Sequence, residues 1–275
     1  MGKIRPNFRM TLLISSLAFT YIAPLSEIIL PAHFTFKGTY VVLLLLSSTL
    51  SAIYLMLSIL YRGHVESNSE AINLIDHDEI KRFCKKCRNH KPERAHHCSS
   101  CGHCIKKMDH HCFWINNCVN YDNQGHFIRF LFFTALANWL IFLYMSIEFI
   151  AVLLFNKPLR HRRDYYILVI SGISSLVFLV MTSFFFYLQL RLALMNMTFI
   201  EEMKQEDMNK IQGLTTLRSP YDRGIINNLI DTLGPPYALF LIGPFGDGMT
   251  FAKRHPIEHW KLQYDYHCIE DLIVI

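Results

Sequence analysis

The residues most able to bind metal or to react in this sequence are seven cysteines in one short stretch. They fall between Cys84 and Cys118, and the eighth cysteine is the distant Cys268. A Cys-x2-Cys pair lets two thiolates bind one tetrahedral zinc ion from a single tight turn. The spacing therefore predicts a metal-binding module, and it reads as Cys84-x2-Cys87, His96-His97-Cys98-x2-Cys101-x2-Cys104, Asp109-His110-His111-Cys112 and Cys118.

The cysteine count leaves one thiol without a metal. Two structural zinc ions need eight ligands, and if each takes three cysteines and one histidine, six of the seven cysteines are used. Spacing alone does not say which cysteine remains. The chemical context favours Cys112, because a neighbouring histidine can hold a thiol as thiolate and a carboxylate can orient that histidine. His110 and Asp109 supply both groups next to Cys112.

Apolar segments on both sides of this stretch predict how it is held. Four segments are long and apolar enough to cross a bilayer, at residues 10–31, 38–61, 127–155 and 165–197. We therefore expect an all-α membrane protein with four transmembrane helices. A two-zinc cysteine-rich domain would lie between helices 2 and 3, in the reducing cytosol, where clustered cysteines bind metal or react rather than form disulfides.

These segments predict four regions along the chain. The first two helices, with the N-terminal segment, occupy residues 1–61. A cytosolic connector and the cysteine-rich domain follow at 62–126, with a core at 84–123. Helices 3 and 4 occupy 127–197, and a cytosolic C-terminal tail occupies 198–275.

Lys and Arg decide the orientation of these helices, because cytosolic loops carry an excess of both. Twenty lie in the N-terminal segment, the cysteine-rich loop and the tail, against five in the two short loops. Both termini and the large loop are therefore expected in the cytosol. The loop at 156–164 carries four of those five residues and is an exception to this rule.

The net charge of +5 fits contact with anionic lipid at the membrane surface. Basic and aromatic residues form no pattern typical of nucleic-acid binding, so we expect no nucleic-acid partner. The basic residues nearest the cysteines could instead bind the phosphates of a cofactor. These candidates are Lys85, Lys86, Arg88, Lys106 and Lys107.

The segment from Cys84 to Asn123 resembles the cysteine-rich domain of the DHHC family of protein S-acyltransferases, or palmitoyltransferases. The resemblance rests on Lys91-Pro92-x-Arg94, His97-Cys98, Asp109-His110-His111-Cys112, Trp114, Asn117-Cys118 and Asn123. Four spans with this loop between the second and third also match the family's arrangement. The tail segment Tyr221-Asp222-Arg223-Gly224, with Asn228 and Gly234, is similar to the family's C-terminal motif.

The resemblance implies a ligand set and catalytic roles. One zinc ion would bind Cys84, Cys87, His97 and Cys104, and the other Cys98, Cys101, His111 and Cys118. Cys112 would be the acylated nucleophile, with His110 as its general base and Asp109 orienting His110. Acyl-CoA, such as palmitoyl-CoA, would be the co-substrate, and Cys112 would pass the acyl group to cysteines of cytosolic-face or membrane proteins.

The resemblance also implies that the acyl chain would lie in a cavity among the helices. Residues that recur at helical spacing are our candidates for its lining, namely Ser47, Ser51 and Tyr54 on the second span and Ser171, Ser174 and Phe178 on the fourth. We expect a multi-pass protein of endomembranes, in the Golgi or the endoplasmic reticulum, rather than of the plasma membrane.

This sequence departs from the family pattern at three places. Phe113 stands where the family often has Pro, and Asn120 stands where Gly usually follows Asn-Cys-Val. After the fourth span, Thr198-Phe199-Ile200-Glu201 matches the family's Thr-Thr-x-Glu only in part.

Two other functions compete with an enzyme, namely a non-catalytic zinc adaptor and a membrane-anchored ubiquitin-type ligase. Cys112 discriminates among them, because neither alternative needs a reactive cysteine beside His110.

Overall fold

The computed structural model describes most of the chain, in seven segments. They are residues 8–29, 37–66, 83–155, 162–212, 219–236, 243–244 and 246–254. The connector at 67–82, most of the basic loop at 156–164 and Cys268 lie outside the described residues.

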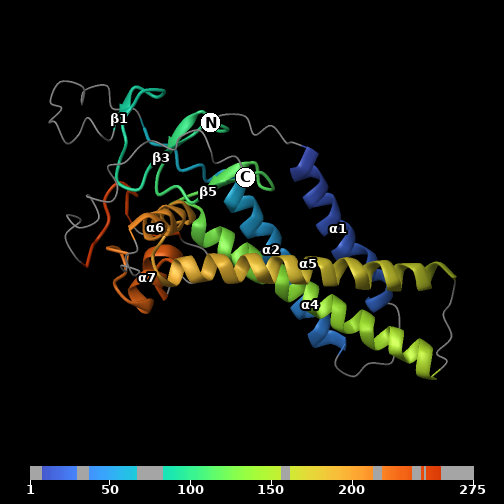
Figure 1. The fold of residues 1–275 in the computed structure, drawn as a ribbon. Helices are drawn as coiled ribbons and strands as arrows, with labels where there is room; N and C mark the ends of the chain where they lie inside the picture. The colour runs from blue at the N-terminus through green and yellow to red at the C-terminus, as the bar shows by residue number, and fades with distance from the viewer. Residues whose placement is uncertain are drawn as a thin grey trace. The chain divides into compact units, whose positions relative to one another are not determined.

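Four long helices account for the apolar segments (Figure 1). They are α1 (Phe8–Ile29), α2 (Lys37–Leu60), α4 (Gln124–Phe155) and α5 (Arg162–Leu194). Within the described residues, three stretches are long and apolar enough to cross a membrane: Gly38–Leu60, Gln124–Phe155 and Asp164–Leu194. The apolar part of α1, Met10–Ile22, is shorter than these. The structure therefore supports three candidate spans.

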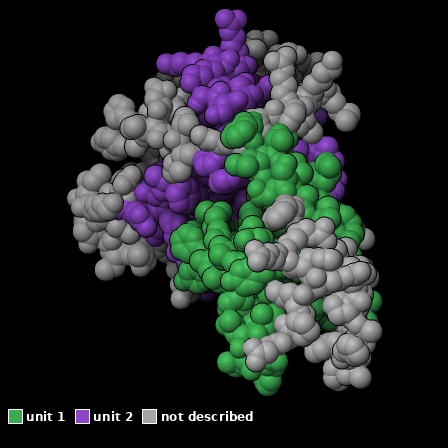
Figure 2. All heavy atoms as spheres, turned by 90° about the vertical axis from the view of Figure 1, so that its right-hand side faces the viewer, with its two compact units in different colours: residues 1–56, 128–188 green, residues 57–127, 189–275 purple. Residues whose placement is uncertain are grey.

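The helices and loops divide into two compact units, coloured separately in Figure 2. Unit 1 comprises residues 1–56 and 128–188, and unit 2 comprises residues 57–127 and 189–275. Each boundary falls inside a helix, so α2, α4 and α5 each contribute to both units.

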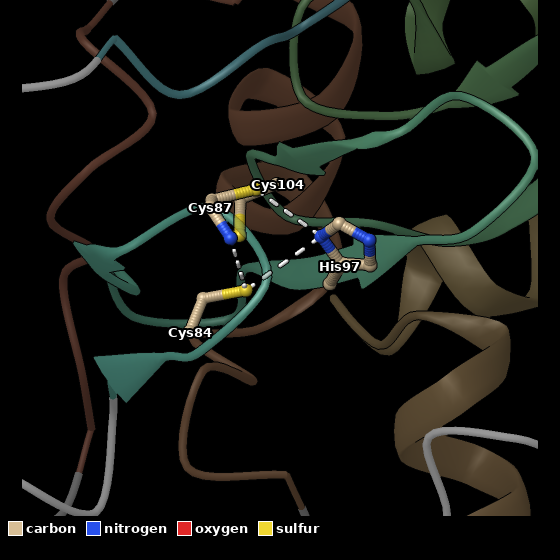
Figure 3. Close-up of side chains that lie close together, drawn as sticks. All are labelled: Cys84, Cys87, His97 and Cys104. Atoms are coloured by element: carbon tan, nitrogen blue, oxygen red, sulfur yellow. Dashed lines mark hydrogen bonds between the residues drawn. The ribbon is translucent and has the colours of Figure 1, made fainter.

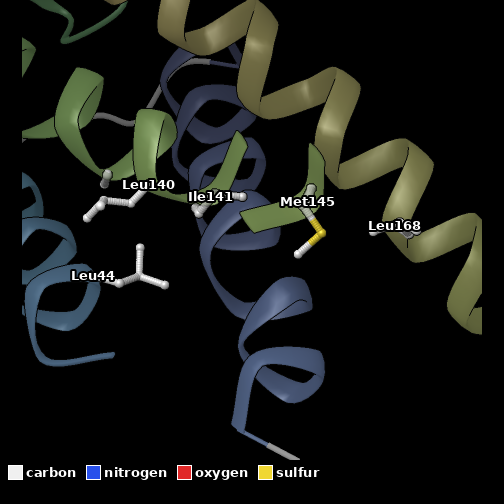
Figure 4. Close-up of a cluster of buried hydrophobic side chains, with 6 residues drawn as sticks. Leu44, Leu140, Ile141, Met145 and Leu168 are labelled. Carbon is white, nitrogen blue, oxygen red and sulfur yellow. The ribbon is translucent and has the colours of Figure 1, made fainter. Parts of the chain in front are cut away.

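Unit 1 has an apolar core made by three helices. It contains Leu44, Ala137, Leu140, Ile141, Met145 and Leu168 (Figure 4). Polar side chains also join these helices, because the hydroxyls of Ser51 in α2 and Thr134 in α4 are hydrogen-bonded at 2.7 Å. Hydroxyl pairs of this kind are common between helices in membranes, where water is absent.

Unit 2 contains three two-stranded antiparallel hairpins, in addition to helices. The strands are β1 (Phe83–Cys84), β2 (Asn89–His90), β3 (His96–Cys98), β4 (His103–Ile105), β5 (His110–Cys112) and β6 (Asn117–Val119). The described chain is mostly helical, but the expectation of an all-α fold is wrong for the cysteine-rich domain, which contains these short strands. The runs of residues between the Cys-x2-Cys turns are too short to form a helix. In a hairpin, each residue of one strand lies opposite a residue of the other strand.

Two further helices complete unit 2, and the first of them packs against the hairpins. They are α6 (Phe199–Gln212) and α7 (Ile225–Leu233). The Arg94 guanidinium binds both carboxylate oxygens of Glu201 at 2.7 Å, and the two side chains are almost fully buried. Ile200 packs beside Ile105 and Met108 in a small core. The start of α6 is thus fixed against the cysteine-rich hairpins.

Candidate active site and metal centres

The first cluster of metal-ligating side chains joins two hairpins (Figure 3). Cys84 and Cys87 lie at the β1–β2 turn, where the Cys87 backbone N–H donates to the Cys84 sulfur at 3.4 Å. His97 and Cys104 are register partners in β3 and β4. His97 Nδ1 lies 3.6 Å from the Cys84 sulfur and 3.2 Å from the Cys87 sulfur.

The second cluster repeats this plan one hairpin further along. Cys98 and Cys101 lie at the β3–β4 turn, and His111 and Cys118 are register partners in β5 and β6. His111 Nδ1 lies 3.4 to 3.6 Å from the three sulfurs. The hairpin β3–β4 therefore contributes to both clusters, so the two clusters interleave along the chain.

The donor sets and their separations fit a tetrahedral metal ion. Within each cluster the four candidate ligand atoms all lie within 4.8 Å of one another. With zinc bond lengths of about 2.3 Å to sulfur and about 2.0 Å to nitrogen, a tetrahedral site places sulfur and nitrogen roughly 3.5 Å apart. The observed distances match this value. Two Cys/His clusters of unit 2 could therefore each bind a metal ion.

Strand geometry separates His110 from the second cluster. Successive side chains of a strand point to opposite faces, so His111 faces the cluster while His110 and Cys112 share the other face of β5. Cys112 belongs to neither cluster. The strand thus places a histidine and a thiol together, away from the metal ligands that surround them in the sequence.

Asp109 is completely buried and is held by three donors. His110 Nδ1 lies 2.6 Å from its Oδ2 oxygen, and the Gln189 amide donates to the same oxygen at 2.9 Å. The Phe199 backbone N–H donates to Oδ1 at 2.8 Å. His110 is in turn hydrogen-bonded to Cys112, so the three residues form a connected set in which the carboxylate fixes the imidazole.

Burial opposes the charged form of each of these groups, but their mutual contacts prevail. The hydrogen bond with His110 helps to hold the pKa of Asp109 below its usual range. Asp109 and Cys112 raise the pKa of His110 to about 10. The His110 imidazole and nearby backbone N–H groups lower the pKa of Cys112. This is the pattern of a thiolate–imidazolium pair.

Asparagines connect the end of α2 to this site. The Asn117 amide donates to the backbone carbonyl of Ser58 and Asn123 donates to the same carbonyl, both at 3.0 Å. Both amides also donate to the Tyr61 carbonyl at 2.9 Å. The last carbonyls of a helix lack partners within it, so these amides satisfy the end of α2 and fix it against β6.

The five basic candidates occupy different environments. Lys85, Lys86 and Arg88 are exposed on the β1–β2 turn. Lys106 Nζ lies 2.9 Å from the Asp122 carboxylate. Lys107 is buried, and burial together with nearby Arg94 lowers its pKa to about 7. Lys107 is therefore poorly suited to bind a phosphate from solvent.

The sequence that carries this site matches the model of a known family. A family model described as DHHC palmitoyltransferase covers residues 77–206, which include both clusters and Asp109-His110-His111-Cys112. The chain carries a DHHC palmitoyltransferase domain. The matched residues extend past the hairpins through α4 and α5 into α6, and they include Glu201, the partner of Arg94.

Several curated proteins are similar to the chain. Palmitoyltransferase ZDHHC15 of Xenopus laevis is 31% identical over 64% of this chain and 52% of its own length. Palmitoyltransferase ZDHHC3 of Rattus norvegicus is 36% identical over 59% of this chain and 52% of its own length. The probable protein S-acyltransferase 14 of Arabidopsis thaliana is 34% identical, over 58% and 50%. The chain thus spans about half the length of the relatives it matches.

Two contacts to Asp109 were not foreseen from the sequence. Phe199 and Gln189 lie 90 and 80 residues away along the chain. Phe199 acts through its backbone, so its side-chain type carries no signal. Gln189 did carry one, because a polar residue in an apolar span is often functional.

Proposed function

We propose that this chain is a protein-cysteine S-palmitoyltransferase that transfers a long-chain acyl group from acyl-CoA to cysteine thiols. The observation that carries the proposal is the position of Cys112. It lies in neither cluster and shares a strand face with His110, whose ring is fixed by Asp109 at 2.6 Å. An adaptor or a ubiquitin-type ligase would need no such arrangement.

In the first step, the Cys112 sulfur attacks the thioester carbonyl carbon of acyl-CoA. A carbon–sulfur bond to Cys112 forms and the bond to the CoA sulfur breaks. His110, holding the proton taken from Cys112, returns it to the leaving CoA thiolate. The product is an acyl-enzyme and free CoA, with one thioester exchanged for another.

In the second step, an acceptor cysteine repeats this chemistry. His110 takes the proton of the acceptor thiol, whose sulfur attacks the acyl group on Cys112. The Cys112 thiolate leaves and recovers a proton from His110. Because one thioester replaces another, the chain's contribution is mainly positioning and thiolate activation.

The clusters Cys84, Cys87, His97, Cys104 and Cys98, Cys101, His111, Cys118 fit two structural zinc ions. Bound zinc would supply folding energy to hairpins that have little apolar core of their own. Interleaving of the clusters means that each ion would stabilise the β3–β4 hairpin from one side. The ions would thereby fix β5, which carries His110 and Cys112.

The substrates would meet different parts of the chain. Of the basic candidates, Lys85, Lys86 and Arg88 remain available for CoA phosphates. In unit 1, Ser174 and Phe178 of α5, with Ser15, Ser16 and Thr20 of α1, line a hollow of about 320 Å³ that an acyl chain could enter. Ser51 instead bonds Thr134, and Ser47 bonds its own helix, which places both in helix packing.

We further propose that α1 is a fourth transmembrane span, so that both termini lie in the cytosol. Its 22 residues suffice to cross a hydrocarbon core of about 30 Å, at about 1.5 Å per residue. The Lys and Arg distribution supports this orientation. Membrane lipid would surround the helices, and Golgi or endoplasmic reticulum membranes would be the location.

The function is tested by following the acyl group to a second thiol. The purified chain in lipid nanodiscs receives labelled palmitoyl-CoA and a membrane-anchored peptide with a single cysteine. We expect the label on the peptide as a hydroxylamine-sensitive thioester, with a Cys-to-Ser peptide as the control. Release of CoA without label on the peptide would show hydrolysis and contradict the proposed function.

A further inference from the structure

Gln189 is a buried polar residue in an apolar part of α5. It follows the run Phe184-Phe185-Phe186-Tyr187-Leu188, and 6% of it is exposed. A polar side chain in such a segment is costly without a partner, so its partner is informative. That partner is the carboxylate of Asp109.

The contact has the geometry of a good hydrogen bond. Gln189 Nε2 lies 2.9 Å from Asp109 Oδ2, the same oxygen that accepts from His110. Asp109 Oδ1 accepts from the Phe199 N–H. The amide of Gln189 and the Phe199 N–H thus hold the carboxylate from two sides, independently of His110.

The oxygen of the Gln189 amide also supports a specific role for this side chain. Gln189 Oε1 is buried and has no hydrogen-bond partner among the described residues. Turning the amide around would place this oxygen against the Asp109 carboxylate, where two acceptors repel each other. The side chain therefore leaves its own acceptor unsatisfied while it donates to Asp109, a compromise typical of functional sites.

We propose that Gln189 is a positioning residue for acyl transfer, which fixes the Asp109 carboxylate so that His110 stays directed at Cys112. The inference rests on the proposed function, since it concerns the same site. Among the described residues, the Gln189 amide hydrogen-bonds to Asp109 and to neither His110 nor Cys112, so it acts through Asp109. Its loss should affect the rate of acylation and not the affinity for acyl-CoA.

Two variants of the chain test this assignment. Gln189→Met keeps the length of the side chain and removes the donor. Gln189→Glu keeps its size and replaces the donor with an acceptor. The measurement is the single-turnover rate of acyl-enzyme formation with labelled palmitoyl-CoA, as a function of its concentration. We expect both variants to slow the maximal rate by about tenfold, as for loss of a hydrogen bond to a charged group, with the half-saturating concentration unchanged.

A double-mutant cycle separates positioning from a general structural effect. In an Asp109→Ala background, Gln189→Met should have no further effect, because its target is gone. Thr182→Val is the matched control, since Thr182 lies in the same helix and, among the described residues, its hydroxyl bonds the carbonyls of Phe178 and Leu179 in its own helix. It should acylate at the wild-type rate, and all variants should retain two zinc ions.

Three results would overturn the inference. They are an unchanged rate in both Gln189 variants, an equal loss with and without Asp109, and loss of zinc or of folded protein in both variants. Measurements on the wild-type protein distinguish failure of this inference from failure of the proposed function. If wild-type protein acquires no label, the proposed function fails and takes the inference with it. If only the Gln189 comparison fails, the proposed function stands.

Discussion

His110 and His111 are neighbours in the sequence but lie on opposite faces of β5, and this difference gives them different chemistry. His111 Nδ1 lies among the sulfurs of Cys98, Cys101 and Cys118. His110 Nδ1 instead contacts Asp109. One residue is therefore suited to bind metal and the other to move a proton.

The two histidines should fail differently when each is changed to alanine. His110→Ala should keep two zinc ions and lose about 10²- to 10⁴-fold in acylation rate, because the proposed general base is removed. His111→Ala should lose zinc and folding together, because metal binding is folding energy in so small a module. Zinc content per chain and acyl-enzyme rate are the measurements. Loss of zinc in His110→Ala, with zinc retained in His111→Ala, would reverse the assignment.

Much of this chemistry follows from residue types and spacing. Cys-x2-Cys pairs indicate turns whose two thiolates can bind one metal ion, and the sequence Asp109-His110-His111-Cys112 places a base beside a thiol. The choice between the histidines required the strand pairing of β5 with β6. The contacts of Asp109 with Gln189 and Phe199 depend on a fold that brings together residues 80 or more positions apart, which local patterns do not encode.

At the scale of elements, the buried pair of Arg94 and Glu201 fixes α6 against the hairpins. Glu201→Gln should lower the free energy of unfolding by about 3 kcal/mol, because Arg94 would remain buried without its counter-charge. Acylation should slow too, because the start of α6 carries the Phe199 N–H that binds Asp109. Thermal unfolding and acyl-enzyme rate are the measurements.

The neighbouring glutamate provides the control. Glu202 pairs with Arg191, whose side chain is 39% exposed, so Glu202→Gln should cost less than about 1 kcal/mol. Equal destabilisation by the two variants would contradict a specific role for the buried pair.

Asn120, one of the departures from the family pattern, lies against Gly63. Gly63 has a φ of +59°, and a Cβ there would lie 2.3 Å from Asn120 Oδ1. Asn120 is fully buried and donates to the Cys118 carbonyl at 2.7 Å. The side chain that replaces the usual glycine at 120 thus occupies the space beside Gly63.

Gly63→Ala should therefore destabilise the chain by about 1–3 kcal/mol beyond the backbone cost of a positive φ. Gly102→Ala is the matched control, because Gly102 has a φ of +72° and nothing within 4 Å of an added Cβ. Adding Asn120→Gly to Gly63→Ala should recover part of the loss. Equal melting temperatures for the Gly63 and Gly102 variants would exclude the steric explanation.

At the scale of the whole molecule, the number of membrane spans decides where the termini lie. Hydropathy alone predicts four helices, whereas the described structure has three long candidate spans and the shorter apolar segment Met10–Ile22. The sequence pattern locates the apolar segments correctly, but it does not distinguish a helix that spans from one that lies at the interface. That distinction depends on contacts with lipid and with other helices.

Epitope tags at the two ends resolve this point. In sealed vesicles with the cytosolic side outward, added protease should remove both tags if α1 spans the membrane, because four spans return the chain to the side on which it began. A lumenal marker protein should stay intact as the control. Protection of the N-terminal tag alone would mean that α1 does not span.

The most direct test of the proposed acyl-transfer mechanism is whether Cys112 itself becomes acylated. Purified wild type and Cys112→Ser are each incubated with labelled palmitoyl-CoA, and peptides are mapped before and after hydroxylamine. Wild type should carry a hydroxylamine-sensitive acyl group on Cys112. The serine variant should retain two zinc ions and carry none, because a hydroxyl is a far weaker nucleophile than a thiolate near neutral pH. Equal labelling of the serine variant, or zinc-loaded wild type without label on Cys112, would contradict the account.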